Sequence, residues 1–179
     1  MNRYILAAIG DDRPGIVFRL TTVLAKMGAN LANSTMADLE GYFVVVVAFD
    51  IEEERQSEAL LHDLQDDLAD LSLTLSLREI LPFARGKKNE EYLVALRVYG
   101  GDRPGIVAGV TKVIFDWNGN VVELKSYQSN HGSGGTYVMV ILAAFSVDLD
   151  FQSFKVAIQT RAEELDVHVN VEEVEAEAL

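Results

Sequence analysis

The fold is specified by Gly10-Asp11-Asp12-Arg13-Pro14-Gly15-Ile16-Val17, a stretch that recurs as Gly100-Gly101-Asp102-Arg103-Pro104-Gly105-Ile106-Val107. The two copies lie 90 residues apart. Alignment of residues 3–33 with residues 93–123 gives eleven identities in thirty-one positions. Self-similarity at a fixed period is the sequence signature of a repeated structural unit. The sequence therefore predicts two units with the same fold.

Each copy of this stretch lies between a predicted strand and a predicted helix. Apolar-rich segments at residues 3–10 and 92–99 run up to the two copies and are predicted to be strands. After each copy, apolar residues recur at the spacing of a single helix face, so we expect them to face a core. They are Ile16, Val17, Leu20, Val23, Leu24 and Met27 in the first half, and Ile106, Val107, Val110, Val113, Ile114 and Trp117 in the second.

The rest of each half repeats the same order of elements. A second strand, a hairpin and a third strand are predicted over about residues 31–49 and 121–145. An amphipathic helix and an alternating last strand complete each half. The order βαββαβ predicts the α+β fold class, with two ferredoxin-like domains that each carry helices on one face of an antiparallel sheet.

A short segment without apolar periodicity separates the two halves. It begins at Pro82 and contains Gly86 and two lysines, which is typical of a linker. We therefore expect the first domain at residues 1–82, the linker at residues 83–90 and the second domain at residues 91–179.

Composition excludes several function classes. The 179 residues carry a net charge of −13, which disfavours direct binding to nucleic acid or to an anionic membrane surface. Cysteine is absent, so disulfides, thiolate nucleophiles and cysteine metal sites are excluded. The longest apolar run, residues 42–49, has the length of a strand and is too short to span a bilayer. We expect a cytoplasmic protein without a cofactor.

The repeated stretch, followed by an amphipathic helix, a Gly-x-Asn segment and a second strand, resembles the ACT domain. The resemblance covers nearly the whole chain, once at residues 1–82 and once at residues 91–179. A pair of such domains without a catalytic domain is most similar to the glycine cleavage system transcriptional repressor group. The resemblance implies a non-enzymatic regulator that binds an amino acid between domains and acts through a protein partner, such as a transcription factor.

Residue chemistry places the expected ligand site at the repeated turn. Proline suits the opening of a helix, Asp12 is expected to cap free amides, and Gly15 lets a ligand approach the backbone closely. Unpaired amides at a helix start attract a carboxylate. The alternative is helix capping alone. The expected ligand-binding residues are Asp12, Arg13, Pro14, Gly15, Ile16, Val17 and Asn30 in the first half, and Asp102, Arg103, Pro104, Gly105, Ile106, Val107 and Asn120 in the second.

The two asparagines have two interpretations. In the family pattern, Asn30 and Asn120 can hydrogen-bond the bound amino acid, since an amide is both donor and acceptor. The alternative is that they only terminate the preceding helix in a left-handed conformation. Asp11 and Gly101 differ at the same repeat position, which indicates that the two sites are not equivalent.

Other polar residues do not form a recognisable catalytic or metal pattern. The longer loop at residues 128–136 lacks the Lys of a phosphate-binding loop and is interpreted as a hairpin loop. His62, His131 and His168 are far apart and share no metal-ligand spacing. We therefore expect no catalytic residue and no metal.

Two functions are alternatives to an amino-acid-binding regulator. They are a protein-interaction module that binds no ligand and a regulatory subunit of an amino-acid enzyme. A homodimer is compatible with the apolar strands.

Overall fold

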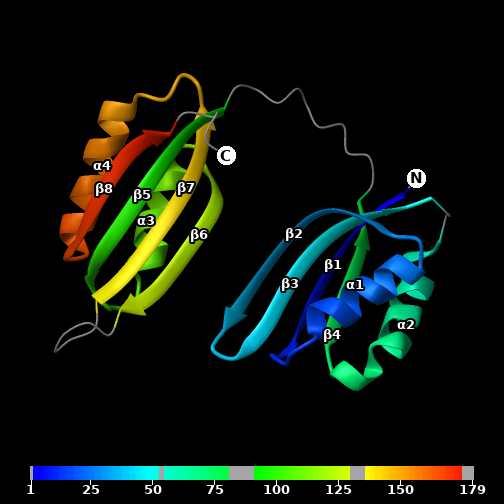
Figure 1. The fold of residues 1–179 in the computed structure, drawn as a ribbon. Coiled ribbons are helices and arrows are strands. Elements are labelled where there is room, and N and C mark those ends of the chain that lie inside the picture. Colours follow the sequence, from blue (N-terminus) through cyan, green and yellow to red (C-terminus); the bar gives the residue numbers. More distant parts are fainter. Residues whose placement is uncertain (1, 53–54, 81–90, 130–135, 175–179) are drawn as a thin grey trace. The chain divides into compact units, whose positions relative to one another are not determined.

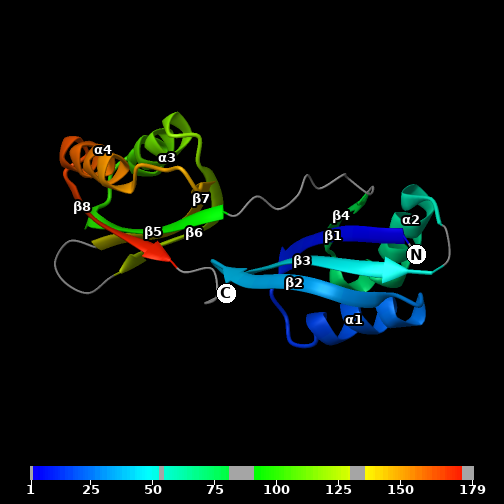
Figure 2. The same cartoon turned by 90° about the horizontal axis from the view of Figure 1, so that it is seen from above.

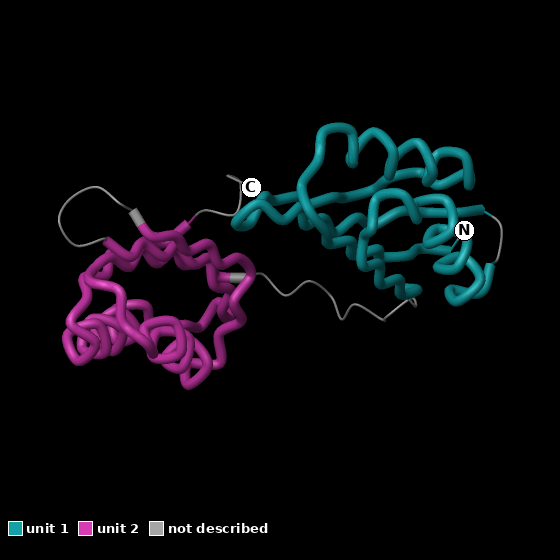
Figure 3. The backbone as a smooth tube through the Cα atoms, turned by 90° about the horizontal axis from the view of Figure 1, so that it is seen from below, with its two compact units in different colours: residues 1–85 teal, residues 86–179 magenta. Residues whose placement is uncertain are grey.

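The computed structural model describes residues 2–52, 55–80, 91–129 and 136–174. The chain divides into two compact units, residues 1–85 and residues 86–179, which are coloured separately in Figure 3. Each unit has its own sheet and its own helices. The expected linker at residues 83–90 lies outside the described residues.

The first unit has the element order that the sequence predicts. Its sheet has the strand order β2-β3-β1-β4, and every neighbouring pair is antiparallel. Helices α1 and α2 both cover the same face of this sheet (Figure 1). The bounds are β1 Asn2–Asp11, α1 Ile16–Lys26, β2 Asn30–Leu39, β3 Tyr42–Ile51, α2 Ser57–Asp67, the short 3-10 helix η1 Ala69–Leu71, and β4 Thr74–Glu79.

The second unit repeats this architecture. Its sheet has the order β6-β7-β5-β8, again antiparallel throughout, and Figure 2 shows α3 and α4 together on one side of it. The predicted α+β fold of two ferredoxin-like βαββαβ units is confirmed. The bounds are β5 Glu91–Gly101, α3 Ile106–Asp116, β6 Asn120–Ser129, β7 Thr136–Ser146, α4 Phe151–Glu164 and β8 Val167–Val174.

A hydrophobic core lies between the helices and the sheet of each unit. Four of the six predicted stripe residues of α1 are buried there, and three of the six of α3. Val17 and Val107 are exceptions, because their side chains are 46 % and 38 % exposed. The prediction that these two residues face the core was wrong. Each follows a buried isoleucine, Ile16 or Ile106, and lies at the edge of the buried helix face.

The helix ends correct a second expectation. The residues with left-handed backbone after α1 and α3 are Gly28 (φ 74°) and Asn118 (φ 55°). Asn30 and Asn120 are the first residues of strands β2 and β6, so they do not terminate the helices in a left-handed conformation. The alternative interpretation of these two asparagines was therefore wrong.

One cross-strand pair distinguishes the two units. In the first unit, Arg3 on β1 faces Asp50 on β3 and donates two hydrogen bonds of 2.8 Å to its carboxylate. This guanidinium lowers the pKa of Asp50. In the second unit the corresponding pair is Leu93 and Ala144, both buried. The same position of the register thus carries an ion pair in one unit and two apolar residues in the other.

Candidate functional site

The turn between β1 and α1 leaves the start of the helix open. Gly15 precedes α1 with a φ of 94°, a conformation that strains any side chain. No side chain of the described residues caps α1, so the expectation that Asp12 caps it was wrong. The reason is that the backbone N–H of Asp12 donates to the carbonyl of Gly41 at 3.0 Å, which fixes Asp12 at the mouth of the hairpin. The first amides of α1 have no partner within the helix.

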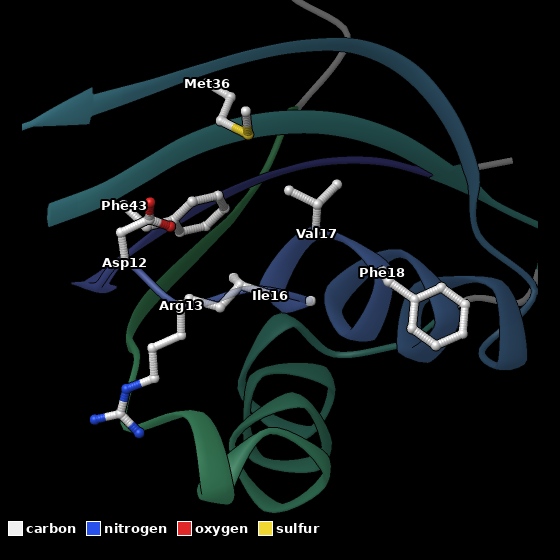
Figure 4. Close-up of a pocket in the computed structure, with 8 residues that line it drawn as sticks. Asp12, Arg13, Ile16, Val17, Phe18, Met36 and Phe43 are labelled. Carbon is white, nitrogen blue, oxygen red and sulfur yellow. The ribbon is translucent and has the colours of Figure 1, made fainter. Parts of the chain in front are cut away.

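A hollow of about 480 Å³ opens beside this turn. We call it the α1 hollow. Figure 4 shows Val17 directed toward the strand that carries Met36, with the ring of Phe43 next to Asp12. The guanidinium of Arg13 points away from this group of side chains (Figure 4). The lining residues are Asp12, Arg13, Gly15, Ile16, Val17, Phe18, Met36 and Phe43.

A narrower apolar slot continues from the α1 hollow between α1 and strands β2 and β3. Its volume is about 80 Å³, and it shares Val17, Met36 and Phe43 with the hollow. Leu24 and Val47 close its inner end. The combined space therefore has a polar end at the helix start and an apolar end toward the core.

The structure brings together most of the site residues expected in the first half. Asp12, Arg13, Gly15, Ile16 and Val17 all line the α1 hollow, and Pro14 lies in the same turn. Asn30 does not join them, because it follows the opposite end of α1. An eleven-residue helix separates the two ends by about 16 Å.

Sequence reasoning missed three residues of the α1 hollow. Phe18 lies one residue beyond the repeated stretch, and Met36 and Phe43 lie on β2 and β3. The predicted hairpin was the signal that could have found the two strand residues. If β3 pairs with β1, the hairpin lies next to the turn between β1 and α1. Met36 is 58 % exposed although it is apolar, which marks the strand as a boundary of the site.

The corresponding turn of the second unit has the same backbone. Gly105 precedes α3 with a φ of 97°, and again no side chain in the described ranges caps the helix. The polar side chains differ: Asp102 accepts a hydrogen bond of 2.6 Å from Gln128, and Arg103 pairs with Asp166 at 2.6 Å. Asn120 is at the far end of α3, as Asn30 is for α1.

Other chemistry-bearing side chains are engaged in ordinary surface contacts. His62 pairs with Asp66 at 3.1 Å, and the ring of His168 stacks on Tyr99. Within the described ranges, no group of three or more acidic or histidine side chains is arranged to hold a metal ion. Among those same residues, no helix is long and apolar enough to cross a membrane. His131 lies outside the described residues.

Comparison with known proteins agrees with this architecture. A family model described as the ACT domain matches residues 2–78. A UPF0237 protein of Methanococcus maripaludis is 32 % identical over 80 residues, which covers 44 % of this chain and 84 % of the relative. A UPF0237 protein of Methanopyrus kandleri is 35 % identical over 63 residues, or 35 % of this chain and 70 % of the relative.

Two solved structures match both units. An unknown protein from Galdieria sulphuraria is 26 % identical, covers 97 % of this chain and 99 % of its own, and has a TM-score of 0.81. A proposed glycine cleavage system transcriptional repressor is 16 % identical, with 97 % and 98 % coverage and a TM-score of 0.68, and is therefore similar in fold. The matched family model, the relatives and the repeated turn lead to one conclusion: the chain belongs to the ACT-domain family.

Proposed function

We propose that this protein is a non-catalytic regulator that binds a free amino acid at the start of α1 and thereby controls its association with a protein partner. The observation that carries the proposal is the α1 hollow, which joins an uncapped helix start to an apolar slot. An amino acid has a charged head and a side chain, and these two ends match the two ends of the hollow.

The helix start supplies the polar half of the site. The free amides of Val17 and Phe18 and the helix dipole favour a carboxylate. The carboxylate of Asp12 lines the same hollow and favours an ammonium group. Together these groups suit a zwitterion better than a simple anion, because an anion alone would meet the charge of Asp12.

The apolar slot selects the side chain. Val17, Met36 and Phe43 stand at its mouth, and no charged side chain lines it among the described residues. A space of about 80 Å³ accepts a few carbon atoms. Burial of each methylene there stabilises binding by about 0.8 kcal/mol. We therefore expect an aliphatic amino acid in the first unit.

Strand β2 connects the ligand to a partner. It is an edge strand of its sheet, all ten of its residues are exposed, and it carries Met36 at the hollow. An unpaired edge can accept a strand from another chain, including a second copy of this protein. A partner at this edge would close the hollow, so ligand and partner would stabilise each other's binding.

The similarity in fold to a proposed glycine cleavage repressor suggests where to seek the partner. We propose a protein of gene regulation, with the enzymes of glycine and one-carbon metabolism as the regulated system. The alternative is an interaction module without a ligand or a regulatory subunit of an amino-acid enzyme. Phe18, which is 71 % exposed, would serve either case as a contact residue.

Calorimetry with the twenty amino acids tests the proposal. The wild type is compared with Gly15→Ala, which places a methyl group in the hollow, and with Gly28→Ala as a matched control. Both glycines have positive φ, and in the described part of the chain no heavy atom lies within 4 Å of a methyl group added at either one. Gly28 lies at the opposite end of α1. Both variants are expected to lose similar stability, and only Gly15→Ala is expected to lose binding.

Two results would decide against the proposal. If no amino acid binds the wild type at millimolar concentration, the sensor function fails and the interaction module remains. If Gly28→Ala weakens binding as much as Gly15→Ala, the ligand does not lie at the start of α1.

A further inference from the structure

The second unit contains a buried polar group that has no hydrogen-bond partner among the described residues. Tyr137, on β7, is only 9 % exposed, and its hydroxyl is fully buried without a hydrogen-bond partner among the described residues. Within the ranges that the structure describes, no other buried side-chain nitrogen or oxygen atom lacks a partner. Leaving a buried hydroxyl unpaired destabilises the folded state, so such a group calls for an explanation.

The register places Tyr137 at the turn before α3. Tyr137 faces Gly100 on β5, as Phe43 faces Gly10 on β1. Phe43 lines the α1 hollow, where its ring lies beside the helix start (Figure 4). Tyr137 belongs to the same core cluster as Ile106, the first residue of α3. Tyr137 and Phe43 therefore occupy equivalent positions, and they differ only by the hydroxyl group of Tyr137.

The neighbouring positions change in the same direction. Met36 corresponds to Ser126, because Met36 pairs with Val45 and Ser126 with Met139 in equivalent registers. Asp102 is held by Gln128 beside this turn. The second turn thus combines free helix amides, a serine and an unsatisfied phenol where the first has methionine and phenylalanine.

We propose that the two turns bind different amino acids, and that Tyr137 makes the second one the site for a polar side chain. This inference rests on the proposed function. The amides at the start of α3 bind the ligand's carboxylate, and the Tyr137 hydroxyl donates to an acceptor oxygen of its side chain. The first turn retains the aliphatic ligand. The protein would then respond to the concentrations of two different amino acids, one at each turn.

The test uses asparagine and leucine, which have nearly the same shape but differ in polarity, within a panel of polar and aliphatic amino acids. Backbone amide NMR distinguishes the sites, because residues 15–18 report the first turn and residues 105–108 the second. A polar ligand is expected to shift the second set, and leucine the first. Tyr137→Phe is expected to weaken the polar ligand roughly 3- to 10-fold, as loss of one hydrogen bond does, and to leave leucine unchanged.

Tyr137→Phe has a second readout that a purely structural tyrosine would not give. Because it removes an unsatisfied hydroxyl, the unliganded variant is expected to melt at a higher temperature than the wild type. The matched control Phe43→Tyr buries a new hydroxyl in the first unit and is expected to lower its melting temperature without affecting the second turn.

The outcomes separate the two proposals. If leucine binds at residues 15–18 but no polar amino acid prefers residues 105–108, this inference is overturned and the proposed function stands. The same holds if Tyr137→Phe binds the polar ligand as tightly as the wild type does. If no amino acid shifts either set of amides, both proposals fall.

Discussion

The two units have one backbone and two chemistries. Both turns keep a glycine with φ near 95° and an uncapped helix start, yet the side chains around them differ. The first unit has Phe43 and Met36 where the second has Tyr137 and Ser126. This contrast indicates that the duplicated residues set the geometry of the turn, while the unduplicated residues around it set the chemistry of its surroundings.

The cores differ in the same manner. In the second unit the rings of Phe145 and Phe154 lie 4.7 Å apart, and Trp117 packs against Phe154 at 5.8 Å. The first unit has Met27 at the position of Trp117 and Leu60 on the corresponding helix. Since the only tryptophan of the chain is in the second unit, its fluorescence reports the unfolding of that unit separately.

The largest effect is expected from Gly119→Ala. A Cβ at Gly119 would lie 2.7 Å from Cζ of Phe145 and 2.8 Å from Cγ2 of Ile114. Overpacking of this kind destabilises by about 2–3 kcal/mol. The first unit has Ala29 at the corresponding position, and Ala29→Gly removes one methyl group worth about 0.8 kcal/mol.

Denaturant titration followed by Trp117 fluorescence and by circular dichroism measures both variants. Gly119→Ala should shift the fluorescence transition of the second unit to lower denaturant concentration. Ala29→Gly should leave that transition unchanged and shift only the dichroism change that comes from the first unit. Equal losses in the two variants would show that the aromatic core does not impose this difference.

The next effect is expected to be the same in both units. Gly15→Ala and Gly105→Ala each force a side chain into a left-handed conformation, with φ of 94° and 97°. The cost is about 1–2 kcal/mol at each site. Thermal unfolding of the two variants measures it. A much larger loss at one glycine than at the other would contradict the equivalence of the two turns.

The fold could be predicted from the sequence because the patterns that specify its helices and strands are local and occur twice. The repeated turn, the helix stripes and the alternating strands each specify an element, and the duplication checks each one. Two of the errors concern features that depend on tertiary contacts. Asp12 was expected to cap α1, but a backbone bond to Gly41 positions it elsewhere. Val17 follows the core periodicity but lies at the rim of the core.

The site was predictable only as far as it is continuous in sequence. The turn residues of the α1 hollow share one short stretch. Met36 and Phe43 join them only when β3 pairs with β1 in the sheet, and no local pattern specifies that pairing. The distance between Asn30 and the turn followed from the sequence, because the helix predicted between them is about 16 Å long. The family pattern nevertheless grouped Asn30 with the turn residues.

A smaller effect is expected in the pH dependence of stability, which should differ between the two units because only the first has the Arg3–Asp50 pair. The pKa of Asp50 is lowered by its hydrogen bonds and charge interaction with Arg3. The stabilisation by this pair is therefore present above the unfolded pKa, near 4, and is lost as the pH falls through the folded pKa. Asp50→Asn is expected to be less stable than the wild type at neutral pH and equal to it in acid.

The double variant Arg3→Leu with Asp50→Ala gives the first unit the apolar pair of the second, Leu93 and Ala144. It is expected to retain neutral-pH stability better than Asp50→Asn, since removal of one partner leaves the other charge unpaired. Thermal melts from about pH 3 to pH 7, the range in which carboxylates titrate, measure all three proteins. An Asp50→Asn deficit that persists in acid would refute the ionic explanation.

The smallest effect compares helix starts. Asp150 caps α4, because its carboxylate accepts a bond of 3.1 Å from the N–H of Ser153 and another from the Ser153 hydroxyl. Asp12 makes no such cap. Asp150→Ala is expected to lower the melting temperature by more than Asp12→Ala, while Asp12→Ala is expected to weaken ligand binding. The reverse order of melting temperatures would show that Asp12 supports the helix.

Whether the two helix starts receive amino acids is answered by backbone amide NMR of the wild type during titration with each amino acid. We predict that the largest shifts occur at Gly15 and the first residues of α1, 16–18, with a second set at residues 105–108. Shifts that are absent at millimolar amino acid, or that are largest at positions remote from both helix starts, would contradict this prediction.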